Sequence, residues 1–241
     1  MSNNQVHFTL QGKGGVGKSL TSSIIAQYFL ETRGAADCFD TDPVNDTFSQ
    51  YQRFKAKTIN IVGEDNNVNS RAFDELMEYL ISGEGVAVVD NGASTFLPLT
   101  AYMTENNVVS MLKDTGRDVY IHSVITGGQA FDDTVEGLAV MLQTKAAPVV
   151  VWINEFFGEV LFDGKEFVDS DFYKAHRAQI HGVVVITRGN GDTFGKDMEL
   201  MVKNKMTFDE ALDSNTFSIM PKQRLKMMKK ALFSQLNSID F

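Results

Sequence analysis

Short runs of apolar residues alternate along this chain with longer segments in which apolar residues recur every three or four positions. The runs are rich in β-branched residues, as in Val-Ala-Val-Val at 86–89, which is typical of strands buried on both faces of a parallel sheet. Strands are predicted at 6–10, 35–39, 86–89, 119–125, 149–153 and 183–186. Helices are predicted at 20–33, 73–80 and 135–142, and the chain is helical from about 207 onward.

Strands that alternate with helices need crossover connections, so neighbouring strands run parallel. The pattern therefore predicts an α/β fold with a doubly wound, mostly parallel sheet and helices on both faces. We expect residues 1–241 to form a single domain, because no internal repeat, low-complexity stretch or convincing linker interrupts the pattern. Residues 156–178 are less regular and are expected to form an insertion.

Composition narrows the classes of function. The net charge of −9 argues against a general nucleic-acid coat, because phosphate contacts need clustered Lys and Arg. The single cysteine, Cys38, excludes a disulfide within the chain and a CxxC motif, and its place at a predicted strand end favours a buried thiol. No apolar run approaches the roughly 18–20 residues of a membrane span and the N-terminus lacks a signal-peptide pattern, so a cytoplasmic protein is expected.

A glycine-rich turn, Gly-Lys-Gly-Gly-Val-Gly-Lys-Ser at 12–19, separates the first predicted strand from the first predicted helix. It fits the pattern G-x-x-x-x-G-K-[ST] of a phosphate-binding P-loop. Glycines let the backbone wrap a phosphate with its N–H groups inward, and the helix dipole favours the same anion. Lys18 is expected to reach the β- and γ-phosphates, and Ser19 to coordinate Mg²⁺. The residues of this segment expected to bind nucleotide are Gly12, Lys13, Gly14, Gly15, Val16, Gly17, Lys18, Ser19 and Leu20.

The second residue of this loop narrows the class further. With Lys13 between Gly12 and Gly14, near the start of the loop, the segment resembles the deviant Walker A motif of the ParA/MinD and nitrogenase-iron-protein group of P-loop ATPases. The resemblance implies that Lys13 is a signature lysine, which reaches the nucleotide phosphates of a second subunit. Such a cation acts as an arginine finger does and ties hydrolysis to dimerisation. The resemblance thus implies ATP and Mg²⁺ as cofactors, an ATP-bound homodimer, and Lys13, Lys18 and Asp42 as catalytic residues.

An acidic turn follows the second predicted strand and so lies on the nucleotide side of the sheet. Its sequence, Asp-Thr-Asp-Pro-Val-Asn at 40–45, is similar to the group's D-x-D-P-x-x-N segment shortened by one residue. This implies that Asp42 orients or activates the attacking water, that Asp40 supports the Mg²⁺ shell and that Asn45 belongs to the first switch. An ordinary Asp-Pro turn is the alternative.

A further acidic residue, Asp90, directly ends the 86–89 run, as a Walker B aspartate does. A carboxylate at that place holds Mg²⁺ through water, so the predicted metal site comprises Ser19, Asp40 and Asp90. Gly92 would let a second switch approach the γ-phosphate, although the Asn-Gly-Ala-Ser after Asp90 departs from common relatives. A simple strand-end turn is the alternative.

Asn154 directly follows the 149–153 run, where relatives place an asparagine that contacts the base. An amide both donates and accepts hydrogen bonds, as a purine edge demands. Residues 187–190 are expected to complete the base pocket. The preference for adenine comes from the resemblance, since no N-K-x-D motif is present.

The whole chain also resembles one subgroup, the TraL-type ParA-like proteins of plasmid conjugal transfer regions. The resemblance rests on residues 10–19, 40–45, 90–94, 126–130 and 223–226. It implies a role beside a conjugation or type IV secretion system, with a conjugation or relaxosome protein as partner. The Thr-Gly-Gly-Gln at 126–129 is either a partner contact or a tight turn.

The predicted C-terminal helix carries the main basic patch of this acidic chain. Its cations are Lys222, Arg224, Lys226, Lys229 and Lys230, and its apolar residues at helical spacing are Leu225, Met228, Leu232 and Leu236. Three interpretations stay open: an ordinary helix packed on the sheet, a patch for DNA or a partner protein, and a membrane-surface helix of the MinD kind.

These observations favour a slow, Mg²⁺-dependent ATPase that acts as a nucleotide-dependent dimerisation switch. The main alternative is a small-molecule kinase or ATP-dependent ligase of the dethiobiotin-synthetase type, although such enzymes generally lack the signature lysine. An iron–sulfur scaffold would need bridging cysteines, which Cys38 alone does not supply. An assembly module with negligible turnover is a further alternative, because a sequence indicates a phosphate cage and not a rate.

Overall fold

The computed structural model describes residues 4–42, 45–63, 68–144 and 147–241. Over these residues seven strands form one sheet in the order β3-β2-β4-β1-β5-β6-β7, and every neighbouring pair is parallel. The strands are β1 (Gln5–Thr9), β2 (Asp37–Asp40), β3 (Lys57–Thr58), β4 (Val86–Asp90), β5 (Asp118–Thr126), β6 (Val149–Asn154) and β7 (Ile180–Ile186). The predicted fold class is confirmed.

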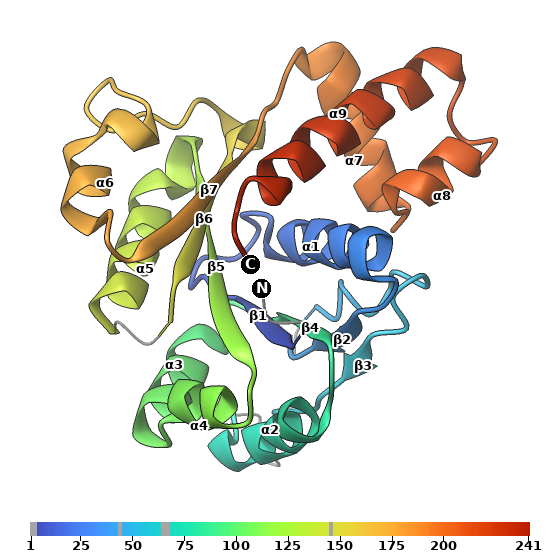
Figure 1. The fold of residues 1–241 in the computed structure, drawn as a ribbon. Helices are drawn as coiled ribbons and strands as arrows, with labels where there is room; N and C mark the ends of the chain where they lie inside the picture. Colours follow the sequence, from blue (N-terminus) through green and yellow to red (C-terminus); the bar gives the residue numbers. More distant parts are fainter. Residues whose placement is uncertain (1–3, 43–44, 64–67, 145–146) are drawn as a thin grey trace.

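Helices cover both faces of the sheet (Figure 1). One layer consists of α1 (Lys18–Arg33), α7 (Lys196–Lys203), α8 (Phe208–Asp213) and α9 (Ile219–Asn237). The other layer consists of α2 (Phe73–Ser82), α3 (Phe96–Glu105), α4 (Val108–Asp114), α5 (Phe131–Thr144) and α6 (Asp171–His176). Side chains alternate across β1, so Val6 and Phe8 join the core under the second layer while His7 packs on Phe29 of α1.

The strand order reverses at β1, which lies between β4 and β5. Ligands of doubly wound sheets bind at the carboxyl edge beside such a reversal. Three polar strand ends meet there in register, because Thr9 of β1 and Asp40 of β2 both align with Asp90 of β4. The topology therefore brings together the glycine loop after β1 and the two acidic turns.

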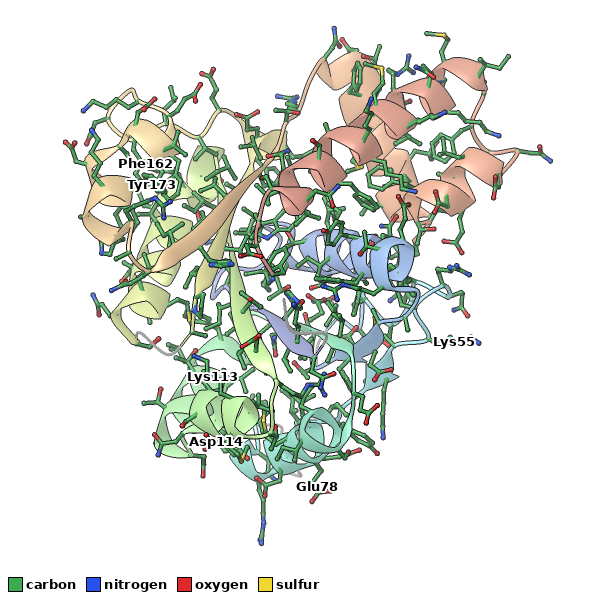
Figure 2. All side chains as sticks on the ribbon, in the orientation of Figure 1. Lys55, Glu78, Lys113, Asp114, Phe162 and Tyr173 are labelled. Carbon is green, nitrogen blue, oxygen red and sulfur yellow. The ribbon has the colours of Figure 1, made fainter. Side chains whose placement is uncertain are left out.

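The segment between β6 and β7 forms a small aromatic cluster of its own. It contains two 3₁₀ turns, Glu155–Phe157 and Phe167–Asp169, followed by α6. Phe162 and Tyr173, which lie near each other in Figure 2, both pack on Phe167, with ring centroids 5.3 and 5.4 Å away. Phe162 also packs on Phe131 of α5, with ring centroids 5.1 Å apart, which holds the predicted insertion against the helix layer that contains α5.

Two histidines are buried between the sheet and α1, and their hydrogen bonds fix their protonation. Trp152 Nε1 can only donate, and it donates to His122 Nδ1 at 2.9 Å. His122 Nε2 therefore carries the proton and donates to His7 Nδ1 at 2.9 Å, and His7 Nε2 in turn donates to Gln5 Oε1 at 3.2 Å. Both rings are neutral, since a second proton on either would set two donors against each other.

Acid is expected to unfold this protein partly through these two rings. Burial lowers the pKa of His122 to about 3, with His181 acting in the same direction, and burial lowers the pKa of His7 well below its usual value. The unfolded chain takes up protons below about pH 6.5 while the folded rings do not, so stability is present above that pH and falls below it. At pH 5 the cost is on the order of 2 kcal/mol per histidine.

The measurement is the free energy of unfolding in urea at pH 7 and pH 5, for the natural protein and for a His7→Gln/His122→Gln variant. The variant should lose markedly less stability on acidification. Equal losses in both proteins would contradict the neutral pair.

Candidate phosphate-binding site

The glycine loop joins β1 to α1 and adopts a conformation that requires its glycines. Gly15 and Gly17 have φ values of 74° and 106°, in the left-handed region that disfavours other residues. A Cβ on Gly17 would lie 2.7 Å from Asn154 Nδ2. Gly17 is also the N-cap of α1 and no side chain caps this helix, so the first N–H groups of α1 remain available for an anion.

Lys18 is folded back into this loop. Its side chain is almost fully buried, and Nζ donates to the carbonyl oxygen of Lys13 at 2.8 Å. Burial lowers the pKa of Lys18, while Asp90 and Asp42 act in the opposite direction. The ammonium group is thus held against the backbone of the loop, within electrostatic reach of Asp90 and Asp42.

Gln11 fixes the start of the loop, and its role was not predicted from the sequence. Its Nε2 donates to the carbonyl oxygens of Val124 in β5 and Thr134 in α5, at 2.9 and 3.0 Å. Its Oε1 accepts the N–H of Gly12 at 2.8 Å. Gly137 provides the space, since a Cβ there would lie 2.0 Å from Gln11 Oε1. The loop is therefore bound to the first turns of α5.

Lys13 points in another direction from Lys18. Its Nζ forms an ion pair with Asp133 Oδ2 of α5 at 2.6 Å, and the two side chains are 45% and 52% exposed. The two lysines of one short loop are thus separated in the folded chain: Lys18 lies inside the loop and Lys13 lies at the surface beside α5.

Asp90 lies beneath the loop and is fully buried. Its Oδ1 accepts a hydrogen bond from Ser22 at 2.8 Å, and Ser22 Oγ is also hydrogen-bonded to Thr9 Oγ1 at 2.8 Å. Burial raises the pKa of Asp90 to about 7, and a hydrogen bond from Ser19 opposes this shift. A carboxylate that is costly to ionise, next to Ser19, is a place where a cation would be stabilising.

Asp40 shapes the acidic turn that follows it. Its two oxygens accept the N–H groups of Asp42 at 3.0 Å and Ser49 at 2.9 Å. Burial raises the pKa of Asp40 to about 6, although these backbone hydrogen bonds lower it. In this conformation Asp40 organises the turn, and its predicted part in the Mg²⁺ shell remains a prediction. Pro43 and Val44 of the same motif lie outside the described residues.

The two acidic turns contact each other through residues that the sequence did not single out. Thr41 Oγ1 donates to Asn91 Oδ1 at 2.8 Å, and Asn91 Nδ2 donates to the carbonyl oxygens of Thr9 and Val89. A Cβ on Gly92 would lie 2.7 Å from Asp42, so the turn after β4 must carry glycine there. Asn91 and Gly92, the unusual pair after Asp90, therefore allow the two turns to pack against each other.

Asn154 is placed beside the loop, but its amide is occupied within the chain. Nδ2 donates to the carbonyl oxygen of Val16 at 2.8 Å, and Oδ1 accepts the N–H of Phe156 at 3.2 Å. A contact with a base would require the amide to exchange one of these bonds, so this contact stays a prediction. Phe156, whose N–H is bonded to Asn154, also lines a cavity of about 510 Å³; the other lining residues are Arg188, Gly189, Gly191, Asp192, Gly195, Lys196 and Glu199. This cavity includes two residues of the predicted base-pocket segment 187–190.

The Thr-Gly-Gly-Gln segment forms a close backbone contact with the segment after β6. A Cβ on Gly127 would lie 2.5 Å from the carbonyl oxygen of Gly158, and Gly128 has a φ of 72°. Thr126 Oγ1 donates to the carbonyl oxygen of Asn154 at 3.0 Å. The geometry accounts for both glycines as a tight turn.

Within the described ranges, no group of three or more His, Cys, Asp or Glu side chains is arranged to hold a metal ion by itself. Mg²⁺ does not need such a group, because it is usually held by one or two carboxylates, water and phosphate oxygens. The residues that fit such an ion are Ser19 and Asp90, because they already contact each other beside the loop.

Replacing Asp90 with asparagine is expected to stabilise the nucleotide-free protein, by about 4 kcal/mol at most. The pKa of Asp90 is raised on folding, so above the pKa of the unfolded state the folded protein bears the cost of a buried charge, which an amide removes. The measurement is urea unfolding at pH 7.5, with Asp114→Asn on the exposed end of α4 as the control. With ATP and Mg²⁺ bound, the natural protein should instead be more stable than the Asp90→Asn variant. A variant that is less stable without nucleotide would show that Asp90 is a structural support.

Comparison with solved structures defines the class of fold. The structure is similar to MinD of Aquifex aeolicus, alone (13% identity) and in its MinC:MinD complex (12% identity), with TM-scores of 0.53 and 98% of this chain and 98–99% of MinD covered. It is also similar to a putative plasmid partition protein of Borrelia burgdorferi bound to AMPPNP, with a TM-score of 0.54, 14% identity, and 98% and 100% of the two chains covered. The fold is therefore that of the MinD/ParA-type P-loop NTPases.

The sequence identifies the family more narrowly. Two Escherichia coli proteins named Protein TraL are 41% and 40% identical to this chain over 236 residues, which is 97% of this chain and 98% of each relative. The chain belongs to the TraL family. No family model matches it. Among the helices built from the described residues, none has the length and apolar character needed to cross a bilayer.

Proposed function

We propose that this protein is a cytoplasmic, Mg²⁺-dependent ATPase that forms a homodimer when ATP is bound and serves as a dimerisation switch in plasmid conjugal transfer. The observation that carries the proposal is the divergent placement of two lysines from one P-loop. Lys18 is buried over the loop of its own chain, whereas Lys13 lies half-exposed at its surface. A cation at the surface is suited to the phosphates of a nucleotide bound by a second copy.

The ion pair that holds Lys13 is weak enough to be exchanged. An ion pair between side chains this exposed contributes about 0–1 kcal/mol, because solvent screens it. A triphosphate offers Lys13 more negative charge and several acceptors. Lys13 can therefore leave Asp133 at little cost when a second subunit brings its nucleotide close.

The other residues of the site have roles that fit ATP hydrolysis. Bound Mg²⁺ would neutralise charge on the phosphates, with Ser19 and Asp90 as the residues that hold it and Asp40 in support. Asp42 is placed by Gly92 and by the hydrogen bonds of its own turn, and it would orient the attacking water. The cavity beside Asn154 would hold the base, for which adenine is proposed because one relative of the same fold is bound to AMPPNP.

Sizing the purified protein with ADP, with ATP and with a non-hydrolysable ATP analogue tests the switch. We expect monomers with ADP, dimers with the analogue, and dimers with ATP that decay as ATP is consumed. The same oligomeric state in all three conditions would refute the switch. Phosphorylation of a metabolite in the absence of any partner would instead support a kinase or ligase. The link to conjugation rests on family membership, and loss of plasmid transfer in the Lys18→Ala strain is its test.

A further inference from the structure

The helix α9 buries one face and leaves the other open. Its inward residues, Leu225, Leu232, Phe233 and Leu236, pack into the core shared with α1 and β7. Figure 1 shows α7, α8 and α9, coloured orange to red, together at the upper right of the molecule. Gln235 bonds the backbone of Val185 in β7, which fixes how α9 is rotated about its axis.

Only part of the basic character of α9 is neutralised within the chain. Arg224 pairs with Asp197 of α7, and Lys229 pairs with Glu31 and Asp209. Lys222, Lys226 and Lys230 recur at every fourth position, and within the described part of the chain none of the three forms an ion pair. The helical repeat places these three lysines in one stripe.

An apolar stripe runs beside the lysines. Ile219, Met220 and Met227 are 84%, 60% and 52% exposed and span about two turns of the helix; Met220 and Met227, seven positions apart, share one side of it, and Ile219 lies in line with the lysines at its start. Exposed large apolar residues that gather on one face of a helix, bordered by charge, are typical of a surface for another protein.

The start of α9 adds positive character to the same surface. Ser218 occupies the N-cap without a side-chain hydrogen bond, and the first turn contains no acidic residue. The positive end of the helix dipole is therefore unopposed, next to Lys222. The three lysines and the N-terminal end of the helix dipole are both positive, in a protein whose net charge is −9.

We propose that this surface docks an acidic amphipathic segment of a partner protein. The surface, here called the α9 face, consists of Ile219, Met220, Lys222, Lys226, Met227 and Lys230. Carboxylates of the segment bind the lysine stripe and the helix start, and its apolar residues cover Ile219, Met220 and Met227. Charge complementarity selects an acidic partner, and the apolar stripe selects a protein over the phosphates of nucleic acid, which offer no apolar surface to cover.

The chemistry can be probed with a synthetic helix of about 20 residues that carries leucine on one face and glutamate on the other. Fluorescence anisotropy measures its dissociation constant without nucleotide, so the result is independent of the proposed ATPase function. Three variants are compared with the natural protein: Lys222→Glu/Lys226→Glu/Lys230→Glu, Ile219→Ser/Met227→Ser, and the control Lys113→Glu. Lys113 is an exposed lysine at the end of α4, on the opposite side of the molecule from α9 (Figure 2). Further arms use duplex DNA and vesicles of phosphatidylglycerol with phosphatidylcholine.

Each α9 variant should weaken peptide binding by about tenfold or more, while Lys113→Glu leaves it unchanged. A peptide with lysine in place of glutamate should not bind. The proposal is overturned if the acidic peptide does not bind, if all variants bind it equally, or if DNA or vesicles bind through the three lysines. Loss of self-association in the variants would assign the face to a second copy and overturn it too. Peptide binding by a protein that fails to bind ATP would refute the proposed function and leave this inference standing.

Discussion

Replacing Lys18 with alanine raises the dissociation constant for ATP by about 100-fold or more, because a buried, charged hydrogen-bonding group contributes about 3 kcal/mol. Lys18 is nearly buried, and its Nζ already lies over the loop, bonded to the carbonyl oxygen of Lys13. The alanine variant loses the cation that would contact the β- and γ-phosphates. Isothermal titration with a non-hydrolysable ATP analogue and Mg²⁺ measures the change.

The control for this prediction separates lost charge from lost structure. Lys18→Met keeps the buried alkyl chain and removes the ammonium group, so it should bind ATP as poorly as the alanine variant while unfolding at a similar temperature. Lys113→Ala, on the far end of α4, should bind as the natural protein does. Nucleotide binding by Lys18→Met within a few-fold of the natural protein would exclude a role for this cation in the site.

The Lys13→Ala variant has the second largest expected effect. ATP binding to the single subunit should remain, since Lys13 Nζ points to Asp133 and not into its own loop. ATP-dependent dimers should disappear, and turnover should fall on the order of 10³-fold, as for removal of a catalytic cation supplied in trans. Sedimentation with the ATP analogue and a phosphate-release assay measure the two effects.

Asp133→Asn is the matched control for the Lys13→Ala variant. It removes the carboxylate that holds Lys13 and leaves the lysine free, so dimers should form at an equal or slightly lower ATP concentration. The gain is small, a few-fold, because the half-exposed pair contributes about 1 kcal/mol at most. If Lys13→Ala dimerised with ATP as the natural protein does, the trans role would be wrong.

The sequence was sufficient to predict the loop and six of the seven strands, all but the two-residue β3, for physical reasons. The buried β-branched run before Asp90 and the glycines of the loop admit few other structures, and the structure has β4 and the P-loop there. The helices α3 and α4 were not predicted. Pro98 in α3 and the paired Val108 and Val109 in α4 weaken a helical signal, and burial against the sheet overrides these local preferences.

The parts of the site that escaped prediction depend on contacts between distant residues. Gln11 binds Thr134 across more than a hundred residues, and Asn91 binds Thr41 across the sheet edge. Neither residue carries a motif that marks its role. The lysine stripe of the C-terminal helix was visible in the sequence, but only the ion pairs of Arg224 and Lys229 show which cations are left over.

Mixing two inactive variants tests the central claim most directly. Lys13→Ala lacks the cation, and Asp42→Ala, which should dimerise with ATP uncleaved, lacks the residue that orients water. If each lysine serves the partner's nucleotide, a mixed dimer has one complete site, so an equal mixture should recover ATPase activity, up to about a quarter of the natural rate where the two variants assort freely. If Lys13 served its own nucleotide, no mixed dimer would contain a complete site, and a mixture as inactive as its two components would contradict the account.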